Sequence, residues 1–113
     1  MKPVRFVGSA KDDLSTFPKP ARTRAGHELF MVQVGRNPDH WKPMSALGSG
    51  ACEIRVRDEA GAFRVIYVAK FEDAVYVLHA FQKKTQKTSR IDLELARERY
   101  RMARDFAEGV KRD

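Results

Sequence analysis

The sequence predicts an α+β fold: a small antiparallel sheet in β-α-α-β-β-β-α order, a helical hairpin on one face and a C-terminal helix. Three observations predict it. Two stretches before residue 35 carry apolar residues at helical spacing. From Cys52 to Phe81 apolar and polar residues alternate with the period of a strand, and helical spacing resumes near Ser89.

Length and charge limit the classes of function. A chain of 113 residues, 42% apolar and 33% charged, is typical of one soluble globular domain over residues 1–113. Its 22 Lys and Arg against 15 Asp and Glu give a net charge of +7. Such an excess is typical of a protein with a polyanionic partner and, equally, of a basic surface with no specific partner. No stretch has the roughly 20 apolar residues that span a bilayer, so we expect a cytoplasmic protein that does not insert in membranes.

The first part of the chain predicts an edge strand and two helices. Residues 3–7 form the strand, and Ser9 is a good N-cap for a short helix that ends at Pro18. A second helix begins near Pro20 and ends at Gly35. Its apolar stripe consists of Ala21, Ala25, Leu29 and Val32. Residues off the stripe are expected on a solvated face, namely Arg22, Arg24, His27 and Glu28. Residues 37–50 are expected to form an irregular loop.

Three strands and a helix follow. Residues 52–57 form a strand with one apolar face, whereas its other face carries Arg55 and Arg57. The next strand, residues 62–71, is apolar on both faces and therefore central, and residues 75–81 complete an antiparallel meander. The last helix has two apolar stripes, one of Ile91, Leu95, Met102 and Phe106 and one of Leu93, Ala96, Tyr100 and Ala103. It either packs on the sheet or binds a partner.

Cations are concentrated where the last strand ends. Lys83, Lys84, Lys87 and Arg90 follow one another without an acidic residue among them. Neighbouring strands lie about 4.8 Å apart, so these cations and those of the preceding strands, Arg55, Arg57 and Arg64, can line one anion-binding groove. Lys87 and Arg90 belong to the helix entry, and we expect them to follow an RNA backbone. No phosphate loop or metal-ligand spacing is present, so neither cofactor nor metal is expected.

Such a groove could also cleave RNA. Attack by the neighbouring 2′-hydroxyl needs that oxygen deprotonated, the pentacoordinate phosphate stabilised and the leaving 5′-oxygen protonated. Arginine suits the second task because its planar fork binds two phosphate oxygens. A lysine crowded by cations, or His79, suits proton transfer. From its spacing alone, His79 is better explained as a packed strand residue with one hydrogen bond.

Three segments resemble the RelE/HigB superfamily of type II toxins, in its phage-related HigB branch. They are Glu53-Ile-Arg-Val-Arg57, Gly61-Ala-Phe-Arg-Val-Ile-Tyr67 and Leu78-His-Ala-Phe-Gln-Lys-Lys-Thr-Gln-Lys-Thr88, the last followed by a helix with Ala96 and Arg99. The resemblance implies a basic toxin domain that enters the ribosomal A site and cuts mRNA without a metal. It also implies a cognate antitoxin, often a helix-turn-helix protein.

By the same resemblance, Arg64 contacts the scissile phosphate, Arg55 matches a basic position on the preceding strand, and Lys83 and Lys84 match the basic pair after the last strand. Glu53 stands where the RelE type has a lysine, and the C-terminal tyrosine of RelE has no counterpart, so His79 or a lysine would fill that role. Two alternatives stay open: a toxin of the ParE branch that acts on DNA gyrase, and a non-catalytic RNA-binding relic.

Overall fold

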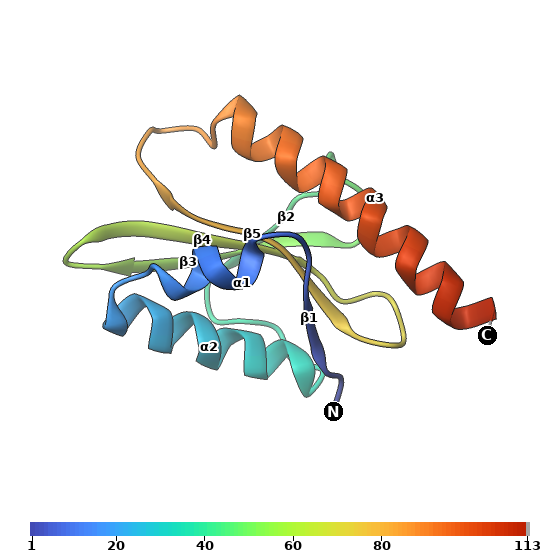
Figure 1. The fold of residues 1–113 in the computed structure, drawn as a ribbon. Helices are drawn as coiled ribbons and strands as arrows, with labels where there is room; N and C mark the ends of the chain where they lie inside the picture. Colours follow the sequence, from blue (N-terminus) through green and yellow to red (C-terminus); the bar gives the residue numbers. More distant parts are fainter. Residues whose placement is uncertain (113) are drawn as a thin grey trace.

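The computed structural model describes residues 1–112, with side chains for residues 1–110. The elements run in the order β1 (Val4–Phe6), α1 (Ala10–Ser15), α2 (Lys19–Gln33), β2 (Trp41–Pro43), β3 (Ala51–Asp58), β4 (Gly61–Val68), β5 (Val75–Lys83) and α3 (Arg90–Arg112). Figure 1 shows α1 and α2 on one face of the sheet and α3 on the other. The predicted α+β class and order of elements are confirmed, with the short strand β2 added.

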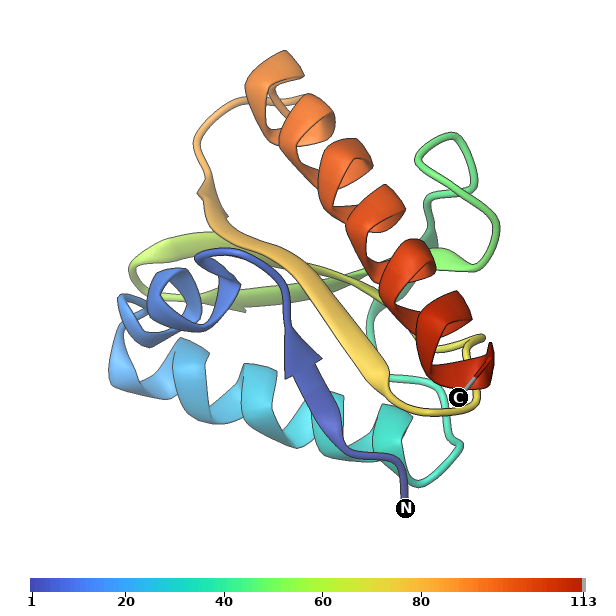
Figure 2. The same cartoon turned by 45° about the vertical axis from the view of Figure 1, so that its right-hand side comes forward.

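The sheet has five strands in the order β1-β5-β4-β3-β2. Strands β2 to β5 pair antiparallel, as the alternation predicted, and β1 lies parallel to β5 at the edge. Figure 2 shows β1 crossing in front of the helical hairpin beside β5. The predicted central strand is confirmed, because β4 has paired neighbours on both sides and its residues from Phe63 to Val68 are buried.

Each face of the sheet has its own apolar core. The face covered by α1 and α2 buries the predicted stripe of α2 against alternate residues of the strands, including Ile54, Phe63 and Val65. The opposite face is covered by α3 through Ala96, Tyr100, Ala103 and Ala107. Of the two predicted apolar stripes of α3, the one with Ala96 packs on the sheet, whereas Ile91, Met102 and Phe106 of the other are exposed.

Glu28 is a correction to the sequence prediction. Its side chain was expected on a solvated face, but the residue is only 1% exposed. One carboxylate oxygen accepts a hydrogen bond from the backbone N–H of Asp39 at 2.6 Å, and the other lies 3.0 Å from Nε of Arg24. A carboxylate can be buried when a hydrogen bond and an ion pair of this kind replace its contacts with water, even where it lies off the apolar stripe of its helix. Glu28 therefore fastens the loop after α2 to the helix.

The predicted irregular loop is wrong at residues 41–43, which form β2. Trp41 is opposite Ile54 on β3, and Pro43 is opposite Cys52. A strand with Pro43 is tolerated here because β2 is an edge strand and the missing N–H is not needed. Pairing with a long neighbouring strand therefore outweighed a local sequence that favours turns.

A β-bulge in β5 sets the orientation of the residues after it. Ile66 is opposite His79 but Tyr67 is opposite Val77, so Leu78 is an extra residue. Arg99 from α3 donates through Nη1 to the carbonyl of Leu78 at 3.0 Å and through Nη2 to Oγ of Ser9 at 2.8 Å. Gly8 makes room for it, since a Cβ there would lie 2.8 Å from Nε of Arg99. The bulge turns His79 toward α3.

No helix of residues 1–112 combines the length and the apolar character that crossing a lipid bilayer requires.

Candidate functional site

The strand register brings the predicted strand cations together at one end of the sheet. Arg55 on β3 is directly opposite Arg64 on β4, and Arg64 is opposite Phe81 on β5. One step further toward the strand ends, Arg57 and Lys83 are both opposite Ala62. Residues opposite one another in a sheet share a face, so all four cations start on the α3 side. We call Arg55, Arg57, Arg64, Lys83 and Lys84 the cation cluster.

Two hollows in the surface meet at this cluster. The edge hollow, of about 650 Å³, is lined by Pro20, Arg24, His40, Arg55, Val56, Arg57, Asp58 and Arg64. The loop hollow, of about 430 Å³, is lined by Arg57, Ala62, Arg64, Lys83, Lys84, Thr85 and Gln86. Arg57 and Arg64 line both hollows. Every residue of the cation cluster therefore borders a space that a phosphate group can enter.

Arg64 is the most buried member of the cluster, at 7% exposure. Its Nη1 donates to the carbonyl of Phe63 at 3.1 Å, and its Nε lies 3.4 Å from Oε1 of Glu53. Burial lowers the pKa of Arg64 below its ordinary value, the carboxylate of Glu53 raises it, and the neighbouring cations Arg55 and Arg57 lower it. The guanidinium is thus held in a partly desolvated place, where its interaction with a phosphate is stronger than in water.

Glu53 is the residue that the sequence reasoning missed. It is 2% exposed, and its Oε1 lies 3.3 Å from Nε of Arg55 and 3.4 Å from Nε of Arg64. Its Oε2 is buried without a hydrogen-bond partner among the described side chains. A signal was available: Glu53 and Arg55 are two residues apart on one strand, so they had to share a face. The departure from the RelE pattern at this position is a carboxylate between two guanidinium groups.

His79 lies outside both hollows, in a packed position. The residue is 6% exposed, and its Nε2 lies 2.6 Å from Oδ1 of Asp92 in the first turn of α3. Its ring stacks on Phe81 with 4.9 Å between ring centroids, and its Nδ1 is buried with no partner in the described part of the chain. Ser89 donates to Oδ2 of Asp92 and accepts from its backbone N–H, and it thereby caps the start of α3. His79 therefore joins β5 to the start of α3.

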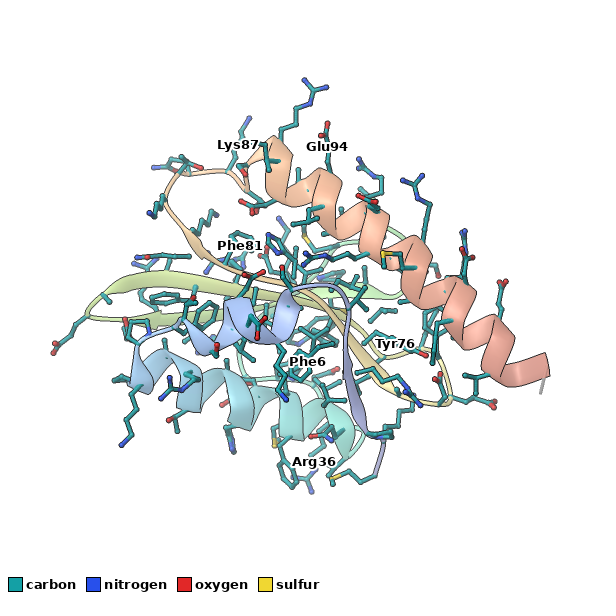
Figure 3. All side chains as sticks on the ribbon, in the orientation of Figure 1. Phe6, Arg36, Tyr76, Phe81, Lys87 and Glu94 are labelled. Carbon is teal, nitrogen blue, oxygen red and sulfur yellow. The ribbon has the colours of Figure 1, made fainter. Side chains whose placement is uncertain are left out.

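The remaining predicted residues divide between the loop and the helix. Lys83 and Lys84 line the loop hollow, whereas Lys87 and Arg90 line neither hollow. Figure 3 shows Lys87 where the loop leads into α3, and Phe81 on the α3 side of the sheet. Arg90 points to solvent, with Nε 2.9 Å from Oε1 of Glu94. Lys87 and Arg90 are thus placed beside the cluster rather than in it.

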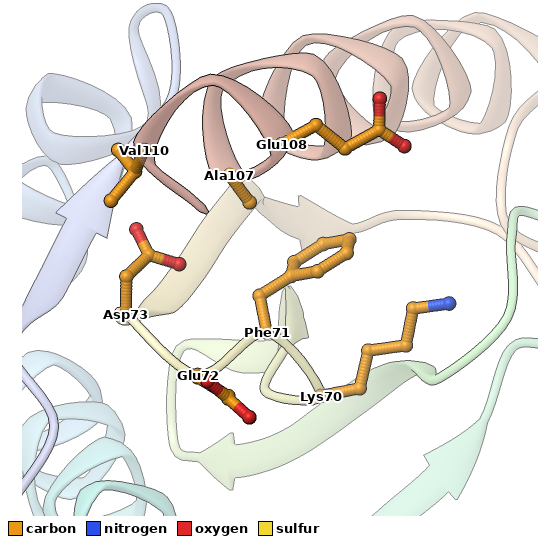
Figure 4. Close-up of a pocket in the computed structure, with 7 residues that line it drawn as sticks. All are labelled: Lys70, Phe71, Glu72, Asp73, Ala107, Glu108 and Val110. Atoms are coloured by element: carbon orange, nitrogen blue, oxygen red, sulfur yellow. The ribbon is translucent and has the colours of Figure 1, made fainter. Parts of the chain in front are cut away.

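A third hollow has the opposite charge and does not suit phosphate. It lies between the β4–β5 turn and the end of α3, as Figure 4 shows, with a volume of about 500 Å³. Its lining includes the acidic residues Glu72, Asp73 and Glu108 and one cation, Lys70. Repulsion from three carboxylates disfavours an anion there.

Comparison with known proteins adds the family. A family model described as "Phage derived protein Gp49-like (DUF891)" matches residues 12–101, which include every strand of the candidate site and about half of α3. No curated protein matches the chain. Because the match covers most of the sequence, the chain belongs to the phage-derived Gp49-like family, which is part of the HigB/RelE-like toxin–antitoxin group.

Proposed function

We propose that this protein is the toxin of a type II toxin–antitoxin pair and cleaves mRNA on the ribosome. The observation that carries the proposal is the pair Arg55 and Arg64, opposite each other across β3 and β4 and bordering two hollows with Arg57, Lys83 and Lys84. Five cations around a surface of this size favour a substrate with several phosphates. The family supports a toxin with an antitoxin as its partner.

The proposed reaction is transesterification within the RNA. The 2′-oxygen loses its proton and attacks the phosphorus, the P–O2′ bond forms as the P–O5′ bond breaks, and the leaving 5′-oxygen takes up a proton. The products are a 2′,3′-cyclic phosphate and a 5′-hydroxyl. Arg64 and Arg55 stabilise the charge that develops on the non-bridging oxygens. Arg57 binds the adjacent phosphate, and Lys87 and Arg90 contact the RNA backbone beyond it.

Proton transfer is assigned to Lys83 and Lys84, because both line the loop hollow beside Arg64. His79 is the alternative: it lies two residues before Phe81, which is opposite Arg64, but Asp92 occupies its Nε2. The two assignments predict different cleavage activities for the same mutant. His79→Gln keeps a hydrogen bond to Asp92 and retains cleavage if the lysines transfer the protons, whereas it loses cleavage if His79 does.

The test is a translation extract programmed with a defined mRNA, to which purified protein is added. New 5′ ends within codons are expected, and Arg64→Ala should reduce their yield by about 10³-fold, the effect of removing an arginine that stabilises a phosphoryl transition state. Arg101→Ala is the matched control, because Arg101 is an exposed arginine on α3 that lines neither hollow. Equal cleavage by wild type and Arg64→Ala would remove Arg64 from the mechanism.

The same protein samples distinguish the alternatives. Inhibition of gyrase supercoiling without any RNA cleavage would replace the proposal with a ParE-like activity. Salt-dependent RNA binding with neither cleavage nor growth arrest on induced expression would replace it with a non-catalytic role.

A further inference from the structure

Glu53 is a buried acid in the centre of a basic site. It is the one acidic residue whose carboxylate contacts members of the cation cluster among the described side chains. Its two contacts are made by a single oxygen, Oε1, which lies 3.3 Å from Nε of Arg55 and 3.4 Å from Nε of Arg64. Arg55 donates a hydrogen bond to this oxygen through its Nε, whereas the buried Nε of Arg64 forms an ion pair with it but makes no hydrogen bond with the described side chains.

The outer nitrogens of both guanidinium groups make no hydrogen bond to Glu53. Among the described side chains, Arg55 makes no hydrogen bond through Nη1 or Nη2, and Arg64 uses Nη1 for the carbonyl of Phe63. A guanidinium is planar and rigid, so fixing its Nε also fixes the direction of its Nη pair. Phosphate is recognised by two parallel N–H donors from such a pair.

Charge balance explains why an acid is needed at this place. Arg55 and Arg64 are direct cross-strand neighbours, and like charges in that position repel each other. Without Glu53 the partly buried Arg64 would face Arg55 and Arg57 with no anion. The pKa of Arg64 reflects this balance, since burial and the two arginines lower it and Glu53 raises it.

We propose that Glu53 is a positioning residue that orients the guanidinium groups of Arg55 and Arg64 toward the scissile phosphate of the RNA. This inference rests on the proposed function and adds a residue to its site. Glu53 does not contact the RNA, because it is buried beneath the two arginines. It acts on the rate of cleavage by fixing the donors before the substrate arrives, rather than on RNA affinity.

The discriminating variant is Glu53→Asp, which keeps the charge and withdraws the carboxylate by one methylene. An error of about 1 Å in the placement of catalytic groups costs on the order of 100-fold in rate. We therefore expect the maximal rate to fall by about 100-fold while half-saturation changes by less than about threefold. A residue with only a structural role would leave the rate of the folded fraction unchanged.

The experiment uses ribosomes stalled on a defined mRNA, mixed with increasing protein, and measures single-turnover cleavage. Wild type, Glu53→Asp, Glu53→Gln and the control Glu98→Gln are compared; Glu98 is an exposed glutamate on α3 that lines neither hollow. Far-UV circular dichroism and thermal melting verify folding. A Glu53→Asp protein that cleaves within about threefold of wild type overturns the inference, whereas loss of rate at unchanged half-saturation supports it.

A second measurement does not depend on cleavage. In NMR spectra of the free protein, the Nε–H proton of Arg55, which is hydrogen-bonded to Glu53, should exchange slowly with water in wild type and quickly in Glu53→Gln. If wild type does not cleave mRNA, the proposed function fails while this measurement still tests whether Glu53 holds Arg55. Identical exchange rates in the two proteins would refute the positioning role.

Discussion

Arg64→Lys keeps the charge of the candidate site and removes its planar fork. The substitution loses the 3.1 Å hydrogen bond from Nη1 to the carbonyl of Phe63 and replaces the Nε contact with Glu53 by a single ammonium. One hydrogen bond of this kind contributes about 1 kcal/mol to folding, so the variant should remain folded. Loss of one positioned donor to a transition state costs about 10²-fold to 10³-fold in rate, and we expect cleavage to fall by that factor.

The salt dependence of RNA binding distinguishes the role of the planar guanidinium of Arg64 from the role of its charge. The affinity for single-stranded RNA should fall with salt along the same slope in wild type and Arg64→Lys, because both carry one positive charge. Arg64→Ala should reduce that slope by about 0.7, the contribution of one phosphate contact. Fluorescence anisotropy with a labelled 12-nucleotide RNA at several salt concentrations measures the slopes. Cleavage by Arg64→Lys within threefold of wild type would refute the requirement for a fork.

Two further predictions concern stability. Arg99→Met should lower the free energy of unfolding by about 1–3 kcal/mol in urea titrations, because the carbonyl of Leu78 is left buried without its donor, and equal stability would show that water replaces the guanidinium. Burial, followed by the neighbouring Cys52 and Glu28, raises the pKa of the Tyr67 phenol above its value in the unfolded chain, which is about 10. The stability that this shift contributes is fully present below about pH 10 and is lost as the pH rises further. Unfolding free energy should then fall by about 1.4 kcal/mol per pH unit for this phenol, and a Tyr67→Phe protein that shows the same alkaline slope as wild type would contradict the assignment.

The sequence predicted the faces of the strands because alternation follows from the geometry of an extended chain. Side chains two residues apart share a face wherever the strand is regular, which placed Arg55 with Arg57. The same pattern predicted a central strand over residues 62–71, and β4 ends at Val68, three residues earlier. The bulge at Leu78 could not be predicted in this way. The bulge depends on Arg99, which is 21 residues further along the chain and donates a hydrogen bond to the carbonyl of Leu78, the extra residue of the bulge.

The buried acids were missed for a related reason. Periodicity treats every carboxylate as solvated, but Glu28 and Glu53 are buried, and each contacts one group from another part of the chain besides an arginine on its own element. The partners of Glu28 are a backbone N–H 11 residues away and an arginine one helical turn before it. The short strand β2 was missed because its pairing with β3 depends on tertiary position rather than on local preference. Predictions from residue patterns therefore located the cations of the site and overlooked the anion between them.

The contact of Arg99 with Ser9 has a consequence for the synthesis of the chain. The two residues are 90 positions apart, and β1 likewise finds its partner only in β5. Strand β1 therefore remains without a strand neighbour until β5 has been made, and long-range contacts of this kind slow folding. The cations of β3 and β4 are made before the lysines that border the loop hollow, and α3 is made after both. The candidate site is therefore incomplete on the nascent chain until β5 and the loop after it have been synthesised.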